Sequence, residues 1–190
     1  VEQLTNLRTT PNLSTWRPCD GVETAFAWKA AISSRNKPTA LVLSRQTTHL
    51  QSRNEETFSE IPKGAYILKE PENDLHGIIM ATGSEVSLAM QAADVLNREG
   101  FAVRVVSMPS VDTFLEQDSS YRESVLPSEI RVRLAVEAAH PDYWRKFVGL
   151  EGAVIGVDSY GKSAPGGTVM EVFGINEENV VSTMRNMLDA

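Results

Sequence analysis

Arg45 is the residue whose type and position best fit ligand binding in this chain. It follows a short apolar run, residues 39–44, and precedes Gln46 and a polar stretch. A short β-branched and aliphatic run is typical of a strand buried on both faces of a parallel sheet. Ligands of open α/β sheets lie beyond the carboxyl ends of such strands, where a guanidinium suits phosphate or carboxylate. From the residues alone, a ligand contact and a structural ion pair with a carboxylate are equally supported.

The turn Thr82-Gly83-Ser84-Glu85 is a second candidate, because it joins an apolar run to an amphipathic one. Backbone N–H groups at such a turn can bind phosphate. The further glycines of the dinucleotide fingerprint are missing. Thr82 and Glu85 also have the spacing of a capping box. The pattern therefore favours an ordinary helix start.

Three glycines, Gly161, Gly166 and Gly167, superficially resemble a phosphate loop. Gly161 and Gly166 have the Walker spacing, but Gly167 occupies the position where that motif requires lysine, so a turn is the favoured interpretation. No serine lies in a G-x-S-x-G elbow, and a hydrolase triad has no support.

Two polar groups are associated with the apolar run 134–138. His140-Pro141-Asp142 follows it and could face a cleft, but the pattern favours a turn in which Asp142 caps a helix. Glu137 lies within the run and needs a partner if it is buried. Arg145 and Lys146 are both candidates for that partner, and the sequence does not choose between them.

Composition excludes several functions. The formal charge of −7 and the pI near 5.0 argue against nucleic acid or an anionic membrane as partner. No apolar stretch approaches the roughly 18–20 residues of a membrane span. Cys19 is the only cysteine, which points to a reducing, cytoplasmic compartment, and the three histidines lack the spacing of a zinc site.

The beginning of the chain resembles a cut end. It opens Val1-Glu2-Gln3-Leu4, with no methionine and no targeting pattern. We therefore expect much of the function to reside in residues upstream of Val1. The 190 residues suffice for one domain and perhaps a fraction of another.

Strands alternate with helices through most of the chain, which predicts a three-layer α/β domain with a mostly parallel sheet covered on both faces. A helix is expected to begin after Asp20, with Glu23 completing a capping signature, and to be apolar around much of its circumference. The further expected strands lie at 76–83, 102–108, 134–138 and 153–157, and the further expected helices at 84–99, 142–149, 168–173 and from about 176.

Apolar content falls sharply between residues 47 and 64, which predicts a linker or surface crossing. We place a domain boundary there. The expected division is a partial domain at 1–50, a linker at 51–64 and a complete domain at 65–190.

Six segments together resemble transketolase of the bacterial type. Each motif is weak alone, but the six occur in the order that the family has and span nearly the whole chain. They are Ser14–Asp20, Leu43–Gln46, Ala81–Val86, Val105–Ser110, Tyr121–Pro127 and Phe173–Asn176.

The resemblance implies that residues 1–50 are the end of the middle, pyrimidine-binding domain and that 65–190 are the C-terminal domain. In that family, thiamine diphosphate and a divalent metal (Mg²⁺ or Ca²⁺) lie between two subunits of a homodimer. The catalytic glutamate, the active-site histidines and the metal ligands of the family would lie upstream of Val1. No catalytic, cofactor-binding or metal-binding residue is therefore expected here, and the chain alone is expected to be inactive and mainly structural.

The resemblance also implies the activity of the whole protein, a transferase of the pentose phosphate pathway. Transketolase moves a two-carbon ketol unit between sugar phosphates. The arginine of the family's Ser-Arg-Gln motif contacts the sugar phosphate, and this role maps onto Arg45.

The sequence departs from the family pattern in two loops, at Thr47-Thr48-His49 and at Gly166-Gly167-Thr168. Two alternatives remain. The first is the beta-type subunit of a 2-oxo-acid dehydrogenase, although its substrates need no sugar-phosphate arginine such as Arg45. The second is a stand-alone binding or oligomerisation module.

Overall fold

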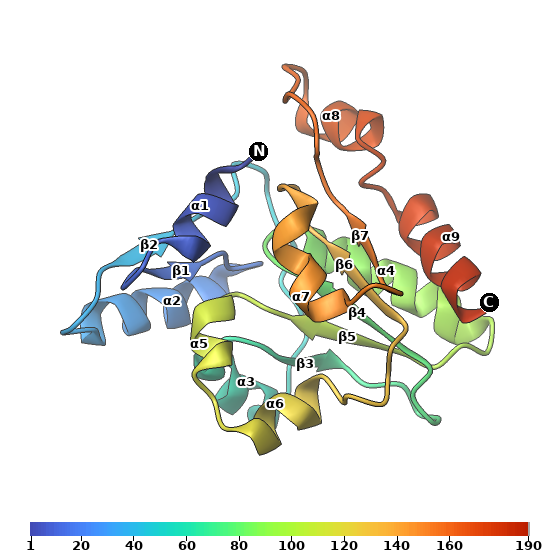
Figure 1. Cartoon of the computed structure of the whole chain (residues 1–190), viewed down its shortest axis with the longest axis horizontal. Coiled ribbons are helices and arrows are strands. Elements are labelled where there is room, and N and C mark those ends of the chain that lie inside the picture. The colour runs from blue at the N-terminus through green and yellow to red at the C-terminus, as the bar shows by residue number, and fades with distance from the viewer. Residues whose placement is uncertain (190) are drawn as a thin grey trace.

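The fold is known from a computed structural model, which describes residues 1–189. Residues 1–41 form a small unit, and the remainder builds a larger α/β domain beside it (Figure 1). The small unit contains α1 (Gln3–Thr9), β1 (Ser14–Trp16), α2 (Gly21–Ser33) and β2 (Thr39–Leu41).

In the small unit, β1 and β2 pair in parallel, and α2 is the crossover between them. Asp20 caps α2 by accepting a hydrogen bond from the Glu23 backbone N–H at 3.0 Å, as the sequence predicted. The strand expected at 39–44 is shorter and only half-buried, so the prediction of burial on both faces is wrong. The physical reason is that β2 packs mainly against β1 and α2, whereas β1, which also packs against α1 and α5, is fully buried.

The larger domain contains a five-stranded sheet in the order β3-β5-β4-β6-β7. Four strands are parallel, and β3 pairs with β5 in the antiparallel direction. The four parallel strands were predicted, whereas β3 and β1 were missed. The strands are β3 (Tyr66–Lys69), β4 (Gly77–Ala81), β5 (Val103–Ser107), β6 (Arg133–Val136) and β7 (Ala153–Ile155).

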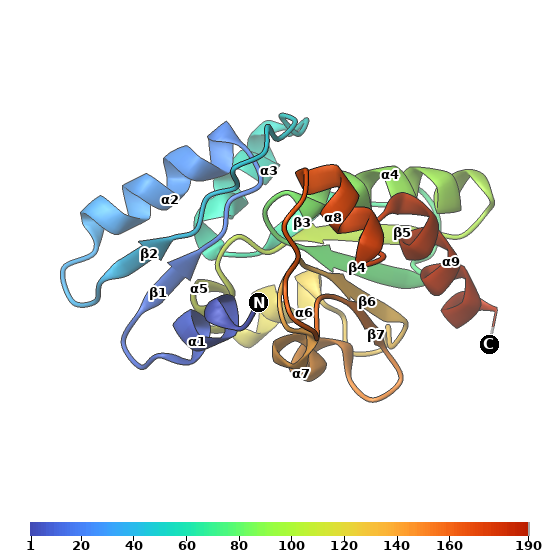
Figure 2. The same cartoon turned by 90° about the horizontal axis from the view of Figure 1, so that it is seen from above.

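Helices cover both faces of this sheet, so the expected three-layer, mostly parallel arrangement is confirmed (Figure 2). One face packs against α4 (Glu85–Arg98) and α9 (Glu177–Leu188), and the other against α5 (Val111–Leu115), α6 (Ser119–Val125) and α7 (Arg145–Val148). Alternate residues of β4 supply the two cores: Ile79 faces α4 and α9, and Met80 faces the opposite helices.

The segment expected to be a bare linker carries structure. It contains α3 (Glu55–Glu60) and the 3₁₀ turn η1 (Ile61–Lys63). Ile61 is fully buried, and the side chain of Arg53 is enclosed as well. The sequence did not predict this structure, because the segment is anchored by one isoleucine and one arginine rather than by apolar residues at helical spacing.

Candidate functional site

Arg45 lies beyond the carboxyl end of β2, where the sequence placed it. The residues on either side of it, Ser44 and Gln46, line a cavity of about 200 Å³. That cavity opens at the N-terminus of α2, and Asp20 and Thr24 form part of its wall. The geometry brings the Ser44–Gln46 segment beside the start of a 13-residue helix.

The Arg45 side chain is exposed and makes no ion pair or hydrogen bond with any residue among 1–189. The structural ion pair, which was one of the two interpretations of Arg45, is therefore not formed within the described chain. Its guanidinium keeps all five N–H donors available.

Beside this cavity lies a buried polar cluster, which we call the Arg53 cluster; it comprises Asp20, Glu23, Arg53 and Tyr66. The guanidinium of Arg53 contacts the Asp20 carboxylate at 2.6 Å and donates to the Tyr66 hydroxyl at 2.9 Å. Tyr66 in turn donates to Glu23 at 2.7 Å. The cluster joins α2 to β3, so it fixes the helix that forms the cavity wall.

Burial affects the titration of groups in and around the Arg53 cluster. Burial raises the pKa of the Cys19 thiol, and the neighbouring carboxylates of Glu23 and Asp20 raise it further. Burial likewise raises the pKa of Tyr66, with Glu23 adding to the effect. Cys19 is therefore a protonated, unreactive thiol, because nucleophilic attack requires the thiolate.

A second buried group of charges lies at the carboxyl edge of the larger sheet. The chain passes from β4 to β5 on one side and then to β6 on the other, so the boundary between β4 and β6 is the switch point of the sheet. Thr82 follows β4 and Glu137 follows β6. Open α/β folds bind their ligands at this position.

Arg8 of α1 enters this switch point. Its Nη1 and Nη2 contact the two carboxylate oxygens of Glu137, each at 2.6 Å, and both side chains are about 2% exposed or less. Its guanidinium carbon lies 5.0 Å from the ring centre of Tyr143 and 5.5 Å from that of Trp144. The Trp144 indole N–H donates to Glu137 at 2.8 Å, so the carboxylate is held from two directions.

Arg17, which follows β1, enters from the same side. Its Nη1 donates to Glu85 at 2.6 Å and to both oxygens of Thr82 at 2.7 Å. The guanidinium lies against Gly83, which has a φ of +55°. A side chain at Gly83 would meet that guanidinium at 2.6 Å, so glycine is required there by both backbone and space.

The electrostatics of the switch point favour full ionisation. Burial alone would raise the pKa of Glu137, but the adjacent guanidinium of Arg8, together with Arg17 and the Thr82 hydroxyl, lowers it to about 2. Burial would lower the pKa of Arg17, but Glu85 and Glu137 raise it. The carboxylates and guanidiniums stabilise each other.

Several sequence predictions are wrong at this edge. Thr82 and Glu85 form no capping box, because their side chains bind Arg17 and Glu137 instead. The partner of Glu137 is Arg8 rather than Arg145 or Lys146. The cap beside Asp142 is provided by His140, whose Nδ1 accepts from the Asp142 N–H at 3.4 Å.

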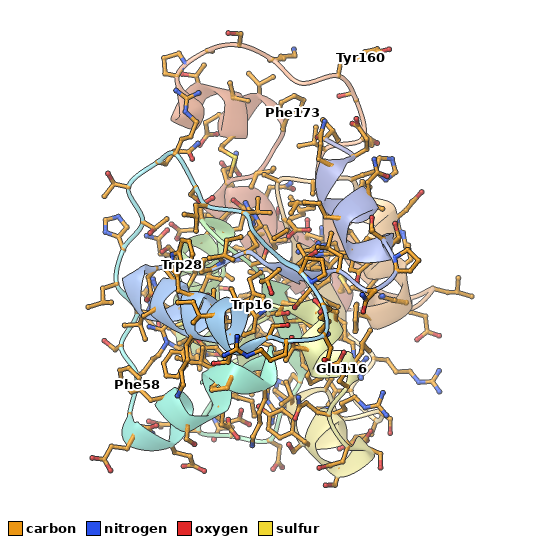
Figure 3. All side chains as sticks on the ribbon, turned by 90° about the vertical axis from the view of Figure 1, so that its left-hand side faces the viewer. Trp16, Trp28, Phe58, Glu116, Tyr160 and Phe173 are labelled. Carbon is orange, nitrogen blue, oxygen red and sulfur yellow. The ribbon has the colours of Figure 1, made fainter. Side chains whose placement is uncertain are left out.

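Of the remaining glycine candidates, Gly166 lies beside the side chain of Gln46, which lines the cavity. The turn favoured for Gly166 and Gly167 is wrong, because both residues are helical. Gly161 is in an exposed loop, and Gly166 and Gly167 begin α8 (Gly166–Val172). Tyr160 projects from that loop, far from Trp16 and Trp28 of the small unit (Figure 3). No group of three or more potential metal ligands occurs within residues 1–189, and none of the helices in that range could cross a membrane.

The chain matches models of known protein families. The model of the transketolase-like C-terminal domain matches residues 64–176, more than half of the chain. The chain belongs to the transketolase family. The model of the transketolase pyrimidine-binding domain also matches residues 1–51, and this stretch includes Arg45.

Individual relatives of the chain are also transketolases. Transketolase 2 of Vibrio parahaemolyticus is 52% identical over 188 residues, which are 99% of this chain and 28% of that protein. The structure of transketolase from Leishmania mexicana superposes with a TM-score of 0.92 at 42% identity, over 100% of this chain and 27% of that one. The structure of transketolase from Campylobacter jejuni superposes with a TM-score of 0.84 at 36% identity, over 98% of this chain and 28% of that one. The chain thus spans just over a quarter of the curated relatives that it matches.

Proposed function

We propose that this chain forms the C-terminal portion of a transketolase that transfers a two-carbon ketol unit between sugar phosphates. The observation that carries the proposal is the 52% identity to a Vibrio transketolase across 99% of the chain. Transketolase structures from Pichia stipitis include complexes with sedoheptulose-7-phosphate and fructose-6-phosphate, which supports sugar phosphates as substrates here.

Residues 1–50 then belong to the pyrimidine-binding domain, 51–64 connect the domains, and 65–190 form the C-terminal domain. The family matches at 1–51 and 64–176 support this division. Thiamine diphosphate supplies the carbon–carbon bond chemistry of the whole enzyme. We propose, from the family resemblance alone, that the residues holding the cofactor and its divalent metal belong to the remainder of the enzyme.

A homodimer in the cytoplasm is part of the same proposal. Support for association with another protein surface comes from α2, where Trp28 is 53% and Ile32 is 70% exposed. Figure 3 looks onto this side of the molecule, which also carries Phe58. Large apolar side chains grouped on one face mark surfaces that associate with other protein.

Arg45 is proposed to bind the substrate phosphate. Three features support this role: it follows β2, it has no carboxylate partner among residues 1–189, and it flanks the cavity at the start of α2. A guanidinium fork pairs with phosphate through two parallel hydrogen bonds. The phosphate is remote from the reacting carbons, so the contact should contribute equally in the ground and transition states.

The test uses a chimera in which this chain replaces the matching residues of the Vibrio parahaemolyticus enzyme. Arg45→Ala should lower kcat/KM for phosphorylated substrates about ten- to a hundredfold, since a charge-assisted hydrogen bond contributes about 1.5–3 kcal/mol. Most of the change should appear in KM, and unphosphorylated analogues should change little. Arg45→Lys should restore activity only in part.

Arg35→Ala is the matched control, because Arg35 is also exposed but precedes β2 instead of following it. It should leave both substrate classes unchanged. Equal losses on phosphorylated and unphosphorylated substrates with Arg45→Ala would refute the phosphate assignment.

A further inference from the structure

The ligand-binding position of the C-terminal sheet is filled by the chain's own arginines. Thr82 and Glu137 lie beyond the carboxyl ends of β4 and β6, at the switch point where open α/β folds hold small molecules. Arg8 and Arg17 reach this point from a part of the chain more than 60 residues away in sequence. In this structure, the group bound at that position of the sheet is therefore a guanidinium.

The chemistry around Arg8 selects that group. Glu137 presents both carboxylate oxygens to it at 2.6 Å, which is the paired geometry that a planar fork matches and an ammonium does not. The rings of Tyr143 and Trp144 lie 5.0 and 5.5 Å from the guanidinium carbon and supply cation–π contacts. Trp144 also orients the carboxylate through its indole N–H.

The surrounding contacts make the site part of the C-terminal domain. Glu137 accepts a hydrogen bond from Thr82, whose hydroxyl also receives one from Arg17. Glu137, Tyr143 and Trp144 all follow β6, so a substitution at Arg8 leaves all three side chains in the protein.

We propose that Glu137, Tyr143 and Trp144 form a guanidinium-binding site in the C-terminal domain, with Arg8 of the same chain as its resident ligand. We call it the guanidinium site. Its occupant fastens α1 to the edge of the larger sheet. A consequence is that the ligand position of this sheet is closed to other molecules while Arg8 is in place.

The inference predicts chemical rescue. Arg8→Ala removes the guanidinium but leaves the carboxylate and both rings, so free guanidinium chloride should bind to the vacated space. A dissociation constant of about 5 mM is reasonable for so small a cation. At 20 mM, far below denaturing concentrations, the ion should then raise the folding equilibrium constant about fivefold.

Thermal unfolding of the 190-residue chain, followed by circular dichroism, measures this effect. Ammonium chloride at 20 mM controls for ionic strength and for charge without a planar fork. Arg131→Ala is the matched variant, because Arg131 is 77% exposed and lies 3.9 Å from an equally exposed Glu151. Neither that variant nor the unaltered chain should be stabilised by guanidinium.

Stabilisation of Arg8→Ala alone, by guanidinium and not by ammonium, supports the proposal. If Arg8→Ala is unfolded at 10 °C without additive, recovery of the folded spectrum on adding guanidinium carries the same meaning. An equal response to both salts, the same response in Arg131→Ala, or no response at all in Arg8→Ala overturns it.

Discussion

Acid should release the buried pair between Glu137 and Arg8, and Glu137→Gln isolates that contribution. The pKa of Glu137 lies at about 2, against an ordinary value of 4.5. A folded-state pKa that is lowered in this way stabilises the native state above the unfolded pKa. The stabilisation is lost as the pH falls from about 4.5 through about 2.

The size of the effect follows from the shift. A difference of about 2.5 pKa units, at about 1.36 kcal/mol per unit, gives about 3 kcal/mol at neutral pH. No allowance for solvent screening is needed, because the Glu137 side chain is 1% exposed. The carboxylate of Glu137 is the group of this buried pair that takes up a proton as the pH falls.

The assay is urea unfolding at intervals from pH 6 to pH 2. Glu137→Gln should be less stable than the unaltered chain at pH 6, because removing one partner strands a buried charge. It should then lose about 3 kcal/mol less on acidification. Glu151→Gln is the control, since Glu151 is 71% exposed, and its acid dependence should follow the unaltered chain. An unchanged acid dependence in Glu137→Gln would refute the reasoning.

Two further predictions concern the attachment of the small unit. Gly83→Ala should lower the free energy of unfolding by about 2–4 kcal/mol in thermal or urea unfolding, because it combines a φ of +55° with a contact of 2.6 Å to Arg17. The control is Gly21→Ala, whose added methyl group meets nothing within 4 Å and should change stability by less than about 1 kcal/mol. Equal losses in the two variants would contradict this explanation. Trypsin should cut first at the exposed Arg45 or Lys162 rather than at the enclosed Arg53, as mass spectrometry of early fragments can show, and a first cut at Arg53 would be inconsistent with its burial.

The larger sheet was predictable because each of its parallel strands is a short apolar run followed by a helix or turn. Val86, Ala89, Ala93 and Leu96 recur at helical spacing and indicated the buried face of α4. β3 was missed because it is only four residues long, and its pairing with β5 defines it as a strand. The helix expected to be apolar around much of its circumference is α2, and its Trp28 and Ile32 are exposed.

The position of Arg45 after a strand was also predictable, since both the strand and the family motif are local in sequence. The contacts between the buried charged residues were not predictable. Arg8 and Glu137 are 129 residues apart, and no pattern along the chain indicates that they meet. Arg17 lies inside the Ser14–Asp20 family motif, which was the only signal available for it. Thr82 and Glu85 misled because two polar side chains at this spacing can form a capping box or, as here, can both bind an arginine that is distant in sequence.

The claim that these residues complete a transketolase is tested most directly by ketol transfer in the Vibrio chimera, measured beside the isolated chain. We expect the chimera to bind thiamine diphosphate and to transfer ketol units between sugar phosphates at a rate within about tenfold of the Vibrio enzyme. The isolated chain should do neither. A chimera that folds and binds the cofactor but transfers no ketol unit would contradict the account, as would transfer by the isolated chain.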